Sequence, residues 1–183
     1  GSYLPHPHSH VLATPIVPAR VSREVITTRS HFMQKERCLL CDIISQEVRQ
    51  GKRLVSMNRS FVAICPFASR FPYETWIVPR FHEANYENLV DEAVKDDLTE
   101  MLVDIMKRIE QFANAYTMEV HTSPNTTFAE PHGDDLPLRE YYHWHIEILP
   151  RDFRSSKYKR DDEFSVLSIT PEEAAESMKA QRI

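Results

Sequence analysis

The chain has 183 residues, of which 42% are hydrophobic and 27% are charged, and its formal net charge is −5. This length suits one domain with a buried core, and the composition is that of an ordinary globular protein. It contains no isolated basic block and no apolar run of about 20 residues, which argues against nucleic-acid partners and membrane spans.

The cysteine and glycine content narrows the function class further. Two of the three cysteines form Cys38-Leu39-Leu40-Cys41, which favours a reducing compartment and a metal site over a disulfide framework. Only three glycines occur, and no dinucleotide-binding or Walker pattern is present. We therefore expect a cytoplasmic protein with neither a signal peptide nor a membrane partner.

The first predicted element is a strand over residues 8–18, which prolines end. It overlaps His6-Pro7-His8-Ser9-His10, where three histidines occupy every second position. In an extended segment these imidazoles line one face, where they suit metal or phosphate binding. The plain alternative is a frayed terminal segment that carries histidines by chance.

Helix-like spacing of apolar residues then predicts a connecting helix over 20–36. A short helix over 42–50 follows, with Gly51 as its C-terminal stop. Three strands come next, at residues 53–57, 61–65 and 75–78.

A wide apolar stripe that starts near Asp91 predicts a long helix packed on a sheet. Two more strands are expected over 116–121 and 142–149, and Thr170-Pro171-Glu172-Glu173 predicts the start of the last helix. Strands adjacent in sequence with helices set between them predict an α+β domain with a mostly antiparallel sheet.

The cysteine pair is the second chemical signal. Cys38-x-x-Cys41 supplies two thiolates, and zinc needs two more nitrogen or sulfur ligands, for which His82, His143 and His145 are candidates. A redox pair would open a helix in a βαβ unit, which the antiparallel pattern does not favour, and chance is the plain alternative. We therefore expect structural zinc.

Several motifs follow one another along nearly the whole chain: His6-Pro7-His8-Ser9-His10, Cys38-Leu-Leu-Cys41, residues 66–79, His82, His121-Thr-Ser-Pro and residues 142–151. In this order they resemble the galactose-1-phosphate uridylyltransferase family of the histidine-triad superfamily, whose members are built from two similar halves. The resemblance implies that residues 1–36 are the active-site strand and connecting helix of the first half. Residues 37–183 would be the C-terminal histidine-triad-like domain.

The same resemblance implies a nucleotidyltransferase that acts on nucleotide sugars and sugar 1-phosphates. His8 matches the nucleophile, which attacks the α-phosphorus and forms a nucleotidyl-histidine before a second sugar 1-phosphate accepts the nucleotide. Ser9 and His10 match positions that contact the transferred phosphate. Self-association as a homodimer is also implied.

The resemblance implies two alternative metal sets, which share one histidine. The first, a zinc site, is Cys38, Cys41, His82 and His143. The second is Glu24, His121, His143 and His145. His6 matches a ligand of the first half's own zinc site. The intact cysteine pair favours the first set.

Two departures from the family pattern keep the reaction open. His10 stands where uridylyltransferases carry glutamine and histidine-triad hydrolases carry histidine, so a hydrolase or phosphorylase of nucleotide sugars or dinucleotides is an alternative. Residues 157–159 and 161–163 replace the family's glycine-containing stretches that help to hold the sugar. A third hypothesis is a non-catalytic, zinc-stabilised domain.

Overall fold

The computed structural model describes residues 16–125, 136–151 and 168–181. Its centre is a five-stranded sheet in the order β1-β2-β3-β5-β4, with every neighbouring pair antiparallel. The strands are β1 Leu54–Met57, β2 Phe61–Ile64, β3 Thr75–Pro79, β4 Ala115–His121 and β5 His145–Arg151. This confirms the predicted α+β class. The predicted strand over 8–18, with His6, His8, Ser9 and His10, lies almost wholly outside the described residues.

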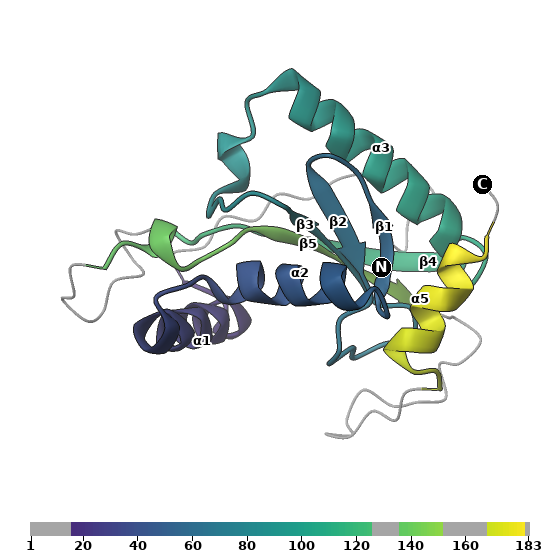
Figure 1. Ribbon diagram of the computed structural model, residues 1–183, viewed down its shortest axis with the longest axis horizontal. Helices are drawn as coiled ribbons and strands as arrows, with labels where there is room; N and C mark the ends of the chain where they lie inside the picture. The colour runs from purple at the N-terminus through teal and green to yellow at the C-terminus, as the bar shows by residue number, and fades with distance from the viewer. Residues whose placement is uncertain (1–15, 126–135, 152–167, 182–183) are drawn as a thin grey trace.

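Helices cover both faces of the sheet. Figure 1 shows α3 on one side and α1 and α2 on the other, with α5 beside the end of α3. The helices are α1 Ala19–Lys35, α2 Leu39–Gln50, α3 Glu92–Ile109 and α5 Pro171–Lys179, with 3-10 turns η1 Tyr86–Asn88 and η2 Leu138–Glu140. None of the described helices combines the length and the apolar character that crossing a membrane requires.

The predicted helix ends are present. Gly51 closes α2 in the left-handed conformation with φ 67°, which glycine adopts without strain. Asp91 accepts a hydrogen bond from the Ala93 N–H at the start of α3. Thr170 and Glu173 form a reciprocal capping box at the start of α5, so local sequence explains these boundaries.

Alternation along the strands separates two apolar cores. Phe61 and Ala63 of β2 face α3 and α5, whereas Val62 between them faces α2. The same alternation in β5 directs Ile146 and Ile148 toward the α3 side. His145 and Glu147 therefore point to the opposite face, on which α1 and α2 lie.

Two boundaries differ from the prediction by three residues, and both affect histidine or cysteine positions. β5 starts at His145, not Tyr142, because the Tyr142 and Trp144 N–H groups donate to the carbonyls of Leu138 and Glu83 instead of joining the ladder. The prediction that His143 lies in this strand is therefore wrong. α2 starts at Leu39 rather than Asp42, so the cysteine pair opens the helix.

Candidate functional site

The structure brings together the first predicted metal set, which we call the thiolate group. It consists of Cys38, Cys41, His82 and His143. The cysteines come from the start of α2, His82 from the segment after β3 and His143 from the turn before β5. One potential ligand atom from each residue lies within 4.8 Å of all the others.

The distances in the thiolate group suit one tetrahedral ion. His143 Nδ1 lies 3.7 Å from Cys38 Sγ and 3.4 Å from Cys41 Sγ, and His82 Nδ1 lies 3.5 Å from Cys41 Sγ. Zinc with sulfur at about 2.3 Å and nitrogen at about 2.05 Å separates these atoms by about 3.6 Å. The donor set and its spacing therefore fit zinc.

A hydrogen bond outside the group fixes the tautomer of one imidazole. His82 Nε2 lies 2.8 Å from the carbonyl oxygen of Arg139, and a carbonyl only accepts, so Nε2 carries the proton. Nδ1, which is the unprotonated nitrogen in the neutral ring, faces Cys41. Metal-binding histidines are commonly oriented by such a bond from their second nitrogen.

The two thiols differ in acidity. The hydrogen bond with Cys41 lowers the pKa of Cys38 despite burial, and bonds with His143 and His82 lower it further. The same contact with Cys38, together with burial, raises the pKa of Cys41. One thiolate beside two imidazoles is therefore favoured before any cation binds.

Although the cysteine pair opens a helix, its surroundings differ from those of a redox pair. α2 leads into the antiparallel β1–β2 pair and not into a βαβ unit. Both cysteines are free, and each faces histidine nitrogens. The third cysteine, Cys65, is buried beside the α3 core, where burial raises its pKa to about 12.

A second cluster lies where the start of α1 meets β4 and β5, and we call it the carboxylate group. It consists of Glu24, His121, His145 and Glu147. His121 and His145 face each other across the β4–β5 pair with ring centroids 4.7 Å apart. Glu147 takes the place that the resemblance gave to His143, which lies in the thiolate group.

Two guanidinium groups reach into the carboxylate group. Arg20 of α1 donates to Glu147 and, at 3.2 Å, to Glu119. Arg70 Nη2 donates to Glu147 Oε2 at 2.7 Å and to Glu74 Oε1 at 2.9 Å. The buried Glu147 carboxylate is thus held between two arginines.

The surrounding charges control the acidity of this group. Burial alone would raise the pKa of Glu147, but the bond with His145 and the charges of His121 and Arg70 lower it to about 2. Burial lowers the pKa of His121, but the Glu24 carboxylate 2.9 Å from its Nδ1 more than reverses this effect. Glu147 is therefore ionised across the ordinary pH range.

Sequence reasoning found seven of these eight residues as candidates and missed Glu147. It also missed Arg20 and Arg70, which contact Glu147. Glu147 follows His145 at the same two-residue spacing that separates His143 from His145, and this spacing was a usable signal. Arg20 and Arg70 carry no such signal, because their roles depend on contacts with a strand far away in sequence.

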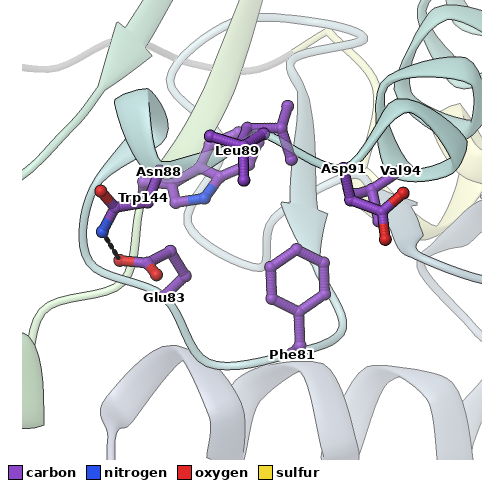
Figure 2. Close-up of a pocket in the computed structure, with 8 residues that line it drawn as sticks. Phe81, Glu83, Asn88, Leu89, Asp91, Val94 and Trp144 are labelled. Carbon is purple, nitrogen blue, oxygen red and sulfur yellow. Dashed lines mark hydrogen bonds between the residues drawn. The ribbon is translucent and has the colours of Figure 1, made fainter.

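A small pocket opens on the α3 side of the sheet (Figure 2). It is lined by Phe81, Glu83, Asn88, Leu89, Val90, Asp91, Val94 and Trp144. Asn88 donates to Glu83 at 3.0 Å across its rim, and the indole of the fully buried Trp144 forms its back. No residue of the thiolate or carboxylate group lines it, so it is separate from the candidate site.

The sequence is similar to known sugar-nucleotide enzymes. Residues 24–166 match the family described as galactose-1-phosphate uridyl transferase, C-terminal domain. ADP-glucose phosphorylase from Arabidopsis thaliana is 28% identical over 181 residues, which are 98% of this chain and 48% of that protein. Galactose-1-phosphate uridylyltransferase from Thermotoga maritima is 26% identical over 189 residues, covering 100% of this chain and 57% of that protein.

Solved structures of related proteins have the same fold. A uridylyltransferase mutant superposes with a TM-score of 0.73 at 32% identity, covering 91% of this chain and 54% of its own. A HIT-like protein from Bartonella henselae shares the fold, with a TM-score of 0.50 at 16% identity and coverage of 75% and 93%. The chain spans about half the length of the curated relatives described above.

Proposed function

Because the chain belongs to the galactose-1-phosphate uridyl transferase family, whose C-terminal domain it matches over residues 24–166, we propose that it works in a nucleotidyltransferase. The enzyme moves a nucleoside monophosphate between sugar 1-phosphates. What carries this proposal is the family match, with His6-Pro7-His8-Ser9-His10 upstream of the matched region.

In the proposed reaction the neutral imidazole of His8 attacks the α-phosphorus of a nucleotide sugar. The bond between that phosphorus and the bridging oxygen breaks, and sugar 1-phosphate leaves with the electron pair. A phosphate oxygen of a second sugar 1-phosphate then attacks the nucleotidyl-histidine and releases His8. Ser9 and His10 contact the transferred phosphate, and the reaction follows ping-pong kinetics.

The proposed role of the thiolate group is structural. Cys38, Cys41, His82 and His143 would hold one zinc ion, which links α2 to the segments before β5 and after β3. The support is the fit of the sulfur–nitrogen distances and the tautomer of His82. In this role the four residues keep the domain folded.

A phosphorylase is the second candidate, and one relative together with His10 favours it. The Arabidopsis thaliana relative is named ADP-glucose phosphorylase. If inorganic phosphate attacks the nucleotidyl-histidine, the products are a nucleoside diphosphate and the sugar 1-phosphate already released. A histidine at position 10 would add positive charge beside the transferred phosphate, where an amide would not.

Acceptor competition tests these alternatives. The full-length protein that carries this chain is incubated with UDP-glucose or ADP-glucose and with galactose 1-phosphate, phosphate or water as acceptor. A transferase prefers the sugar phosphate, and His10→Gln should increase that preference. His8→Ala should abolish all turnover, whereas His132→Ala, outside the quoted motifs, should not. Normal folding without turnover of any nucleotide would support a non-catalytic domain instead.

Self-association as a homodimer is also part of the proposal. β4 is an edge strand, and its side chains Tyr116, Met118 and Val120 are about half exposed on the α3 side of the sheet. An open edge with an apolar stripe favours pairing with another strand. A second copy offers the same edge in the antiparallel sense that two-fold symmetry requires.

A further inference from the structure

The carboxylate group has the residue types of a metal site, yet its contacts are those of an ion-pair cluster. Two carboxylates and two imidazoles converge, and three of the four side chains are buried. However, His121 Nδ1 lies 2.9 Å from Glu24 Oε2, the distance of a direct hydrogen bond. Two ligands on one tetrahedral ion at about 2.1 Å lie about 3.4 Å apart.

A side chain already supplies positive charge at this place. The guanidinium of Arg20 contacts carboxylates from three elements: Glu24 on its own helix at 3.4 Å, Glu119 on β4 at 3.2 Å and Glu147 on β5. Glu147 Oε2 also accepts from Arg70. A divalent ion on that oxygen would lie beside two guanidinium groups and be repelled by both.

The thiolate group differs from the carboxylate group both in the spacing of its ligand atoms and in the charges beside them. Its sulfur and nitrogen atoms are spaced for a shared ion, and the bond from His82 Nε2 to the Arg139 carbonyl directs Nδ1 toward the sulfur atoms. No lysine or arginine contacts its sulfur atoms among the hydrogen bonds of the described residues. The second metal set that the resemblance implies includes His143, but His143 contacts the sulfur atoms of the thiolate group instead.

We propose that Arg20 takes the place of a divalent cation in the carboxylate group, so that the described part of this chain binds metal at the thiolate group alone. Arg20 is the second residue of α1, and α1 has no side-chain N-cap. The same contacts therefore fix the start of α1 to β4 and β5. Arg20 is a positioning residue for the start of α1.

Cobalt provides a direct count, because thiolate-bound Co²⁺ absorbs through sulfur-to-metal charge transfer and Co²⁺ held by oxygen and nitrogen does not. The metal-free, reduced chain is loaded with excess Co²⁺, desalted and analysed for cobalt per chain. We expect one ion in the unmodified chain, with the charge-transfer band. Arg20→Met should bind two ions without additional charge transfer. Arg23→Met, an exposed arginine on the same helix, should bind one.

Two ions in the unmodified chain, falling to one in Glu147→Gln, would overturn the proposal, and so would one ion in both the unmodified chain and Arg20→Met. The first comparison does not depend on whether Arg20→Met folds. Hydrogen exchange of residues 19–25 tests the positioning role. Exchange should be at least tenfold faster in Arg20→Met than in Arg23→Met, with partial protection in Arg20→Lys, and equal rates in the two methionine variants would contradict it.

Discussion

His143 and His145 are separated by a single residue, yet their rings belong to different groups. His143 Nδ1 lies 3.4 Å from Cys41 Sγ, whereas His145 Nε2 lies 3.6 Å from Glu147 Oε1. The break between the turn and β5 falls between the two residues, since β5 starts at His145. One histidine therefore does not have to serve both clusters.

Loss of the thiolate group should unfold the domain. Cys38→Ser removes one of the four proposed zinc ligands, and structural zinc contributes about 10–16 kcal/mol of apparent binding energy to folding in small zinc domains. We expect less than one tenth of an equivalent of zinc by elemental analysis and a lower melting temperature by circular dichroism. Chelation of the unmodified chain should have the same effect.

Cys65→Ala is the matched control for that experiment. Cys65 lies in the α3 core, away from the thiolate group, so its loss creates a small cavity but should leave the zinc content at one equivalent. A metal-free chain that melts at the same temperature as the metal-loaded chain would rule out a structural role for zinc.

The stabilising effect of Glu147 should disappear in acid. Its pKa is lowered from 4.5 to about 2, so the stabilisation is complete above pH 4.5 and is lost as the pH falls toward 2. The shift corresponds to ~3 kcal/mol at neutral pH. Urea unfolding should show this deficit for Glu147→Gln at pH 7 and less than half of it at pH 3. Glu100→Gln, exposed on α3, is the control, and a deficit that does not change with pH would contradict the account.

Arg53 links α2, β1 and α5 through one buried and one exposed carboxylate. Its guanidinium lies 2.6 Å from Glu47 Oε1 and 2.6 Å from Glu172 Oε1, and the side chain of Glu172 is 40% exposed. Arg53→Met should cost about 3–5 kcal/mol because it leaves the Glu47 charge buried without compensation. Glu172→Gln should cost less than about 1 kcal/mol. Similar losses in denaturant unfolding of the two variants would be inconsistent with this difference in burial.

The exposed stripe on β4 should control self-association. Met118→Glu places a charge in the middle of Tyr116, Met118 and Val120 and should shift the chain toward monomer in sedimentation velocity. Val103→Glu makes the same change at an exposed apolar position on α3 and should leave the sedimentation unchanged. If the unmodified chain remains monomeric at all concentrations, the homodimer hypothesis is wrong.

Local signals in the sequence were sufficient for most of the fold. Gly51 and the Thr170 capping box placed two helix ends, and the apolar stripe placed α3. The start of β5 was missed because it depends on a hydrogen bond from Trp144 to the distant Glu83 carbonyl. Such tertiary contacts redirect backbone groups that local pattern assigns to the ladder.

In the candidate site, too, residue types and local spacing could be predicted from the sequence, whereas contacts between distant residues could not. The cysteine pair and the histidines His82, His143 and His145 were candidates from the sequence because few residue types bind zinc. The family resemblance then implied the set that contains His143 and not His145. The role of Arg20 could not be predicted, since the contact between Arg20 and Glu147 joins residues 127 positions apart. Nothing in local sequence distinguishes this arginine from the exposed Arg23.

The role of His8 can be tested by the mass of the protein trapped during the reaction. Full-length protein is mixed with UDP-glucose or ADP-glucose without acceptor, quenched under alkaline conditions that preserve phosphohistidine, and digested for mass spectrometry. We expect one added nucleoside monophosphate, located on the peptide that contains His8 and absent from His8→Ala. An adduct that persists in His8→Ala, or turnover by the unmodified protein without any adduct, would contradict this role.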